Sequence, residues 1–185
     1  HDLWIASNNP QRMIIGDDGG GQVTYNGGQG WSSYYTSATA QIYQVTLDNQ
    51  FPYMIYGAQQ DNSTFAIRNR TNGGGITESD WWPVAGGESG YIAPDPENPN
   101  VTYGGSYGGY LNKYDKELDL SDRIDVWPDN PMGAGAKDLK YRFQWTFPII
   151  ISPHNPDVLY STSQHVHRST DEGMSWEETS PDPTR

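Results

Sequence analysis

Short apolar segments separated by polar turns recur four times along this chain. Each copy has one apolar segment, a polar turn that contains proline, and a second apolar segment that ends in a small residue. The paired segments are Leu3–Ile5 with Met13–Gly16, Tyr43–Leu47 with Met54–Gly57, Tyr91–Ala93 with Val101–Gly104, and Ile149–Ser152 with Val158–Ser161. Segments of this length, rich in β-branched and aromatic residues, are typical of strands. No window has the apolar spacing of an amphipathic helix, so the pattern predicts strand pairs and almost no α-helix.

The turn prolines measure the length of the repeat. They are Pro10, Pro52, Pro99 and Pro156, and their spacing of roughly 40 to 60 residues suits a propeller blade of four strands. The widest gap indicates a surface-loop insertion near residues 119–140, where proline and glycine are frequent. We therefore expect an all-β fold, a single β-propeller segment of about four four-stranded antiparallel blades. The expected blades span about 1–40, 41–88, 89–145 and 146–185.

The strands of each copy are continuously apolar rather than alternating between apolar and polar residues. This pattern predicts strands that are buried on both faces between stacked sheets, with the first two strands of each blade nearest the central channel. Hydrophobic residues make up only 34% of the chain, and the mean hydropathy is −0.79, so the core must be thin and layered. The 21 Gly and 13 Pro suit short strands with tight corners.

Two turns carry the pattern Ser/Thr-x-Asp/Asn-x-Gly-x-x-Trp, which is the Asp-box motif. The acidic or amide side chain of this motif accepts hydrogen bonds from backbone N–H groups of its own turn. Glycine takes a positive φ, and the tryptophan packs beneath the turn between blades. We therefore expect a structural role for all eight motif residues. They are Thr24, Asn26, Gly28 and Trp31 in the first copy, and Ser169, Asp171, Gly173 and Trp176 in the fourth.

The charge and the composition exclude several kinds of partner. The net charge is −12, which disfavours nucleic acid and anionic membrane surfaces, because both require a basic footprint. The chain has no cysteine, so disulfides and cysteine-based zinc sites are excluded. No apolar run has the ~18 residues of a bilayer span, and we expect no membrane insertion. A cation or a neutral polysaccharide would tolerate the negative charge.

Several longer motifs recur in the order typical of one family. They are Asp17-Asp18-Gly19-Gly20, the segment 56–62, the segment 86–90 followed by Asp95-Pro96, the segment 151–156, and the segment 169–173. In these motifs the chain resembles the bacterial sortilin-like, BNR (Asp-box) repeat β-propellers that are often labelled glycosyl hydrolases. It is more distantly similar to xyloglucanase and sialidase propellers. The resemblance implies a propeller with more blades than this chain holds, so we expect the chain to be part of a larger propeller.

The resemblance also shows two departures from the family pattern. The family usually has Gly-Asp-Gly where this chain has Gly87-Glu88-Ser89. It usually has glycine after the asparagine of the second motif, where this chain has Ser63. Both departures lie in segments that we expect at one face of the propeller.

The strands of a blade run outward from the channel, so successive connections alternate between two faces. The turns between second and third strands therefore share one face with the crossings between blades. Most of the unusual polar and aromatic residues fall in these segments, and we expect them around one channel mouth. As ligand-binding candidates they are Asp17, Asp18, Gln60, Asn62, Tyr107, Arg142, Trp145 and His165.

Two further residues of that face are candidates for catalysis. Glycoside hydrolysis uses two carboxylates that flank the scissile bond, one as acid and one as base or nucleophile. Asp61 and Glu88 are the preferred pair, with Asp17 or Asp18 as a third acid, while exposed aromatics such as Trp145 would stack sugar rings. The alternative is that these acids cap their own turns. A calcium ion on Asp17 and Asp18 is a further alternative, and the histidines form no zinc pattern, so we expect no other metal or cofactor.

Three functions remain open from the sequence. The first is a secreted or cell-surface module that binds proteins or glycans. The second is a glycoside hydrolase of xyloglucanase type or its inactive relative. The third is a structural fragment of a larger extracellular assembly. The expected partners are the rest of a larger propeller or a partner protein, together with a polysaccharide, and the expected location is extracellular, periplasmic or the cell surface.

Overall fold

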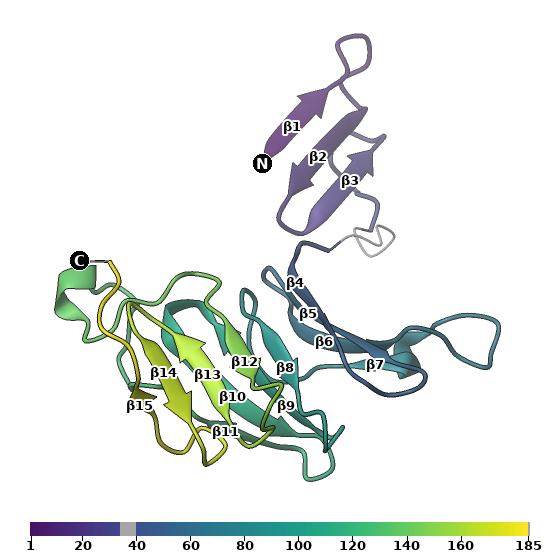
Figure 1. Ribbon diagram of the computed structural model, residues 1–185. Coiled ribbons are helices and arrows are strands. Elements are labelled where there is room, and N and C mark those ends of the chain that lie inside the picture. The colour runs from purple at the N-terminus through teal and green to yellow at the C-terminus, as the bar shows by residue number, and fades with distance from the viewer. Residues whose placement is uncertain (34–39, 185) are drawn as a thin grey trace. The chain divides into compact units, whose positions relative to one another are not determined.

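The computed structural model describes residues 1–33 and 40–184, and in them the chain forms antiparallel sheets joined by turns and loops (Figure 1). The first sheet has the order β1-β2-β3, with β1 (Asp2–Ile5), β2 (Met13–Asp17) and β3 (Gly20–Thr24). The second has the order β4-β5-β6-β7, with β4 (Ile42–Leu47), β5 (Met54–Gln59), β6 (Ser63–Arg68) and β7 (Trp81–Trp82).

The third sheet has the order β11-β10-β9-β8, with β8 (Ile92–Pro94), β9 (Val101–Ser106), β10 (Tyr110–Asp115) and β11 (Leu120–Arg123). The fourth has the order β12-β13-β14-β15, with β12 (Ile149–Ile151), β13 (Leu159–Thr162), β14 (Val166–Ser169) and β15 (Glu177–Glu178). Each sheet thus follows one copy of the sequence repeat. The helical residues in the described chain are three short 3-10 turns, η2 (Glu78–Asp80), η3 (Tyr107–Gly109) and η4 (Ala136–Asp138), so the expected near-absence of α-helix is confirmed there.

The chain divides into two compact units, His1–Ala40 and Gln41–Arg185. The first unit holds the three-stranded sheet. Beyond β3, the Ser32 backbone N–H bonds to the Val23 carbonyl at 2.9 Å, which is the position of a fourth strand. Side chains of β1 and β2 are about half exposed, Leu3 at 47% and Ile14 at 46%. The expected burial of strands on both faces is therefore not seen in this unit.

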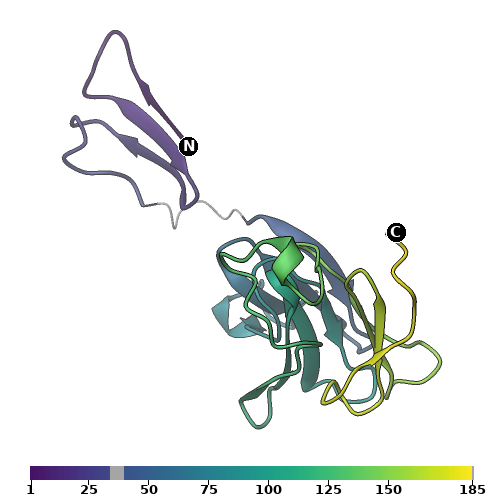
Figure 2. The ribbon, with the colours of Figure 1, turned by 90° about the vertical axis from the view of Figure 1, so that its left-hand side faces the viewer.

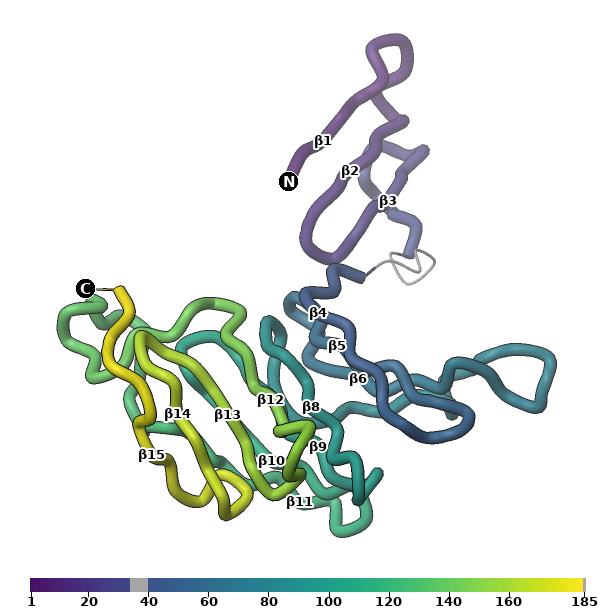
Figure 3. Tube along the Cα trace, viewed as in Figure 1, coloured from purple at the N-terminus to yellow at the C-terminus, as the bar shows by residue number. Residues whose placement is uncertain are grey.

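The second unit contains three successive blades, whose first strands lie next to one another. β4 contacts β8, and β8 contacts β12, so each sheet runs outward from a shared inner edge (Figure 3). This arrangement agrees with the expectation that the first strands of each blade are innermost. Because β5 and β9 lie between neighbours, nearly all of their residues are buried or half-buried.

Two apolar clusters hold the second unit together. The larger one joins the third and fourth sheets and includes Tyr103, Leu111, Phe147 and Leu159. The smaller one joins the second and third sheets and includes Tyr56 with Ile92. Each cluster is a thin layer between two sheets, as the low hydrophobic content predicts.

The loop expected near residues 119–140 begins later than the sequence indicates. Residues 120–123 form β11, which pairs with β10, whereas the segment from 124 to 148 contains only the short turn η4 (green in Figure 2). The sequence of β11 is Leu-Ser-Asp-Arg and all four residues are exposed, so it lacks the apolar signature by which strands are recognised. No helix among the described residues is long and apolar enough to cross a membrane.

Candidate functional site

The two turns with the Asp-box pattern have the same hydrogen-bond network. In one, Ser169 Oγ donates to Asp171 Oδ1 at 2.8 Å and accepts from Gly173 N at 2.9 Å. In the other, Thr24 Oγ1 donates to Asn26 Oδ1 at 2.8 Å and accepts from Gly28 N at 3.2 Å. These side chains are engaged within their own turns, which supports the structural role expected for them.

The tryptophans of these two turns also serve packing. Trp176 Nε1 donates to the Ile124 carbonyl at 2.8 Å and packs against the apolar layer between the third and fourth sheets. Trp31 lies against Gly28 of its own turn, where a Cβ on that glycine would be 3.7 Å from the indole nitrogen. Glycine at this position, with φ 87°, lets the turn lie close to the ring.

A crossing segment, residues 84–90, carries the candidate acid Glu88 from the second sheet to the third. Its backbone is held by Thr102 Oγ1, which accepts from Ala85 N at 3.1 Å, and by the Gly105 carbonyl, which accepts from Gly87 N at 3.0 Å. A Cβ on Gly90 would lie 1.8 Å from the Gly105 carbonyl oxygen. Glycine at position 90 is therefore required for this close approach of two backbones.

Glu88 reaches across to the turn between β5 and β6. Its Oε2 accepts from Gln60 Nε2 at 2.7 Å and from the Asp61 backbone N–H at 3.0 Å. Asp61 has φ 59°, a conformation that aspartate adopts more readily than most residues. The two acids thus meet at one turn, Asp61 from the turn itself and Glu88 from the crossing segment, and their catalytic role stays a prediction.

Gln60 connects the acids to an aromatic group. Its Nε2 also donates to Asp61 Oδ1 at 3.0 Å, and its Oε1 accepts a hydrogen bond from the Tyr43 hydroxyl. The Tyr43 hydroxyl in turn accepts from Trp145 Nε1 at 3.1 Å. Trp145 stacks on Tyr107 with ring centroids 4.7 Å apart and planes inclined by 14°.

We call the residues joined by these contacts the Trp145 site. They come from the second sheet, from the turn between β9 and β10, and from the two segments that lead to the third and fourth sheets: Tyr43, Gln60, Asp61, Glu88, Tyr107 and Trp145. Trp145 is 49% exposed although its ring stacks on Tyr107. The site joins an apolar ring surface to carboxylate and amide groups that are already held in place.

The separation of the two carboxylates bears on their chemistry. One nitrogen, Gln60 Nε2, lies 3.0 Å from an oxygen of Asp61 and 2.7 Å from an oxygen of Glu88. The sum of these distances is the upper limit for the separation of the two oxygens, and it is below the ~6.5–9.5 Å of inverting glycosidases.

The remaining candidates have contacts elsewhere. Asn62 Nδ2 donates to the Gln60 carbonyl at 3.2 Å, within the turn. In the first unit, Asp17 Oδ1 accepts from Gly19 N at 2.8 Å, and Asp18 Oδ1 lies 2.7 Å from His1 Nε2. These contacts engage both carboxylates. Among the described residues, no group of three or more His, Cys, Asp or Glu side chains is placed to hold a metal ion.

Arg142 and His165 contact the C-terminal segment of the chain. Arg142 Nη2 lies 3.1 Å from Asp182 Oδ2. Hydrogen bonds from Thr184 lower the pKa of Asp182 to about 2, and the Arg142 guanidinium adds a smaller effect in the same direction. His165 Nδ1 lies 3.0 Å from the Ser180 carbonyl oxygen and 3.2 Å from Glu178 Oε1. These two residues are therefore fixed by residues 178–184, and their role in ligand binding stays a prediction.

Three residues of functional or structural weight were not singled out from the sequence. In the sequence, Tyr43 is only one residue of a segment expected to form an apolar strand. Ser89 is fully buried and donates to the Trp145 carbonyl at 3.0 Å, so it positions the tryptophan backbone. His167 is buried next to Tyr141, and burial lowers its pKa to about 4. The only sequence signal for Ser89 was that it stands where the propellers resembled in sequence usually have glycine.

Comparison with known proteins gives similarity in structure alone. No family model matches the sequence, and no curated protein matches it. The structure is similar to the GH74 xyloglucanase from Xanthomonas campestris, with a TM-score of 0.51 and 17% identity over 98% of this chain and 30% of the enzyme. It is also similar to an auxiliary nutrient binding protein from Bacteroides thetaiotaomicron, with a TM-score of 0.49 and 13% identity over 97% of this chain and 41% of that one.

The chain therefore spans less than half the length of these structures. At such low identity the likeness establishes the fold and not the activity. Together with the sequential antiparallel order of strands in each sheet, it shows that the chain is a β-propeller segment of about four blades.

Proposed function

We propose that this chain is a glycan-binding segment of a propeller and that it binds a neutral polysaccharide at the Trp145 site. The observation that carries the proposal is the half-exposed indole of Trp145, which stacks on Tyr107 and is anchored by Tyr43. A half-exposed aromatic ring suits the apolar C–H face of a sugar ring. The adjacent amide and carboxylates supply hydrogen-bonding groups for its hydroxyls.

The site is arranged in advance of binding. Trp145 is held by its ring nitrogen, by its stack on Tyr107 and by the Ser89 contact to its carbonyl. Gln60 is held by Tyr43 and Glu88. Groups that are already ordered lose little conformational entropy when a ligand binds, so they are suited to recognition.

The charge of the site favours a neutral ligand. Asp61 and Glu88 are both present, and the chain has a net charge of −12. A uronic acid or another anion would meet repulsion from both carboxylates, whereas sugar hydroxyls donate hydrogen bonds to them. The similarity in fold to a xyloglucanase makes xyloglucan a reasonable first ligand to test.

The test is isothermal titration of the chain with xyloglucan, mixed-linkage β-glucan and galactomannan. Trp145→Ala should weaken binding by about tenfold or more. The substitution removes the aromatic contact with the sugar and the anchor to Tyr43, and about 1.4 kcal/mol of lost binding free energy corresponds to a tenfold change in Kd. Trp81→Ala is the matched control, since Trp81 is exposed to a similar degree, 45%. Equal effects of the two substitutions, or no binding by the unmodified chain, would contradict the proposal.

A glycoside hydrolase is the second candidate, because two carboxylates share one hydrogen-bond donor at the site. Their short separation favours the retaining arrangement, in which the carboxylates are about 5–5.5 Å apart. Reducing-sugar release from the same polysaccharides, abolished by Asp61→Asn or by Glu88→Gln, would support this candidate. Binding without release would leave Glu88 as a group that holds the turn at Gln60 and Asp61.

The wider setting of the chain is also part of the proposal. The two Asp-box turns and the ordered motifs support membership of the bacterial sortilin-like, BNR-repeat propellers. The chain matches only 30% of the xyloglucanase, which supports a role as one part of a larger propeller or assembly. The resemblance to that family and a polysaccharide ligand both support a secreted, periplasmic or cell-surface location.

A further inference from the structure

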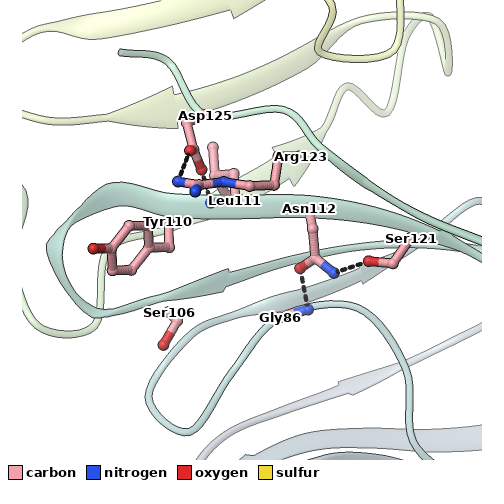
Figure 4. Close-up of a pocket in the computed structure, with 8 residues that line it drawn as sticks. All are labelled: Gly86, Ser106, Tyr110, Leu111, Asn112, Ser121, Arg123 and Asp125. Carbon is pink, nitrogen blue, oxygen red and sulfur yellow. Dashed lines mark hydrogen bonds and ion pairs between the residues drawn. The ribbon is translucent and has the colours of Figure 1, made fainter. Parts of the chain in front are cut away.

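A cavity lies beside the Trp145 site, on the third sheet. It has a volume of about 330 Å³ and is lined by Gly86, Ser106, Tyr110, Asn112, Ser121 and Arg123, together with Leu111 and Asp125 (Figure 4). This volume lies at the lower end of the range of about 300–1,000 Å³ for small-molecule sites, which suits one or two sugar rings. Six of its eight lining residues bear polar side chains, so the cavity is suited to a hydroxylated ligand.

The guanidinium group of Arg123 is the main polar group of this cavity, and its ion pair holds it in place. Arg123 forms an ion pair with Asp125, and Asp125 is itself fixed because its Oδ1 accepts from Leu111 N at 2.7 Å. The Arg123 side chain is 66% exposed, whereas that of Asp125 is only 7% exposed. Arg123 therefore projects toward the ligand from a buried support, and most of its five N–H donors remain available.

The rest of the polar wall is also ordered. Asn112 Oδ1 accepts from Gly86 N at 2.6 Å, and its Nδ2 donates to Ser121 Oγ at 2.7 Å (Figure 4). Because Ser121 Oγ accepts that bond, its own hydrogen is free to donate. The hydrogen bond from Gly86 N to Asn112 Oδ1 also ties the cavity to the crossing segment that carries Glu88.

Ring contacts connect the cavity to the Trp145 site. Trp145 stacks on Tyr107 at 4.7 Å, and Tyr107 meets Tyr110 edge-on at 6.0 Å. The Arg123 guanidinium carbon then lies 5.2 Å from the centre of the Tyr110 ring. These successive contacts cover more than one sugar ring, so a ligand that reaches both ends must be an extended chain.

We infer that this cavity is a second subsite for a neutral glycan whose first contacts are at Trp145. The inference rests on the proposed function and adds to it that the ligand is an oligosaccharide long enough to run from Trp145 past Tyr110 to Arg123. The guanidinium donates a pair of hydrogen bonds to adjacent hydroxyl or ring oxygens, and Ser121 donates a third. A neutral sugar is specified because Asp125 already balances the charge of Arg123.

The experiment is titration of the chain with cello-oligosaccharides and xyloglucan oligosaccharides from disaccharide to octasaccharide. In the unmodified chain, affinity should rise with length until both subsites are filled and then level off. Arg123→Lys keeps the charge beside Asp125 but loses the planar pair of donors. It should weaken the long oligosaccharides by about tenfold and leave the short ones unchanged.

The controls separate this inference from the proposed function. Trp145→Ala should weaken ligands of every length, and Arg168→Lys, at a surface arginine beside Glu177, should change none. If Trp145→Ala abolishes binding while Arg123→Lys has no effect at any length, the second subsite is refuted and the first stands. Arg123-dependent binding of oligogalacturonate in place of the neutral ligands would overturn the neutral assignment, and no binding of any glycan would overturn both.

Discussion

The stability of the fourth blade should depend on a single histidine between pH 4 and pH 6.5. His167, on β14, is 1% exposed and lies between the rings of Tyr141, at 4.6 Å, and Phe143, at 6.2 Å. Its pKa is lowered from 6.5 to about 4, mainly by burial, with the nearby His165 and Lys140 acting in the same direction and Glu178 opposing them. Its Nε2 lies 2.8 Å from Ser163 Oγ, a contact that the neutral ring can make.

The sign and the size follow from this difference in pKa. Because the folded state has the lower pKa, the unfolded state binds more protons between these two values. The contribution to stability is therefore fully present above pH 6.5 and is lost as the pH falls toward 4. A shift of about 2.5 units at 1.36 kcal/mol per unit corresponds to about 3 kcal/mol, a large part of the stability of a small domain.

Urea unfolding followed by tryptophan fluorescence, at a series of pH values from 7 to 4, measures this contribution of His167 to the free energy of unfolding. His167→Gln retains a partner for Ser163 but does not titrate. Over this interval the free energy of unfolding of the variant should therefore fall by about 3 kcal/mol less than that of the unmodified chain. His154→Gln, at an exposed turn, should follow the unmodified chain. The acids with lowered pKa values, Asp171 and Asp182, act below pH 3.8. Parallel profiles for the His167 variant and the unmodified chain would refute the argument.

Three further substitutions test the local geometry by the same unfolding measurement. Ser63→Gly should stabilise the chain by roughly 0.5–1 kcal/mol, because Ser63 has φ 63° and glycine adopts that conformation without strain; a loss of stability would contradict this. Gly90→Ala should lower the free energy of unfolding by more than about 3 kcal/mol, since its Cβ would lie 1.8 Å from the Gly105 oxygen. Gly74→Ala is the control and should be tolerated, because a Cβ there would have no atom within 4 Å. Trp176→Phe should cost about 1 kcal/mol for the bond to the Ile124 carbonyl, and no loss would mean that the bond is not made.

Local patterns made the fold predictable. The paired apolar segments became neighbouring strands, such as β4 with β5 and β8 with β9, because strand length, turn residues and repeat spacing are all encoded within about 50 residues. The Asp-box turns were equally predictable, since the bonds from Ser169 to Asp171 and Gly173 join residues within one turn. β11 was missed because its stability comes from pairing with β10 and not from an apolar sequence of its own.

The candidate site was predictable only in part, because its contacts join distant segments. Counting connections placed Gln60, Asp61, Glu88 and Trp145 at one face, and the structure brings these four together. The sequence could not identify Tyr43 as their link, since it lies 102 residues from Trp145 and has the appearance of an ordinary strand residue. Arg142 shared the same predicted face, yet Asp182 competes for its guanidinium, a contact that connection counting does not reveal.

The Glu88 contact gives a physical reason for glutamate rather than aspartate at this position. An aspartate at this position would be one methylene shorter and could not keep both bonds to Gln60 and Asp61 N without movement of the crossing segment. That segment cannot move freely, because Gly90 lies directly against Gly105 and Ser89 is bonded to the Trp145 carbonyl. Glutamate therefore joins two blades where aspartate would leave its carboxylate free. The same bonds that order Gln60 for a sugar hydroxyl occupy one oxygen of Glu88, which favours recognition over acid–base chemistry at this carboxylate.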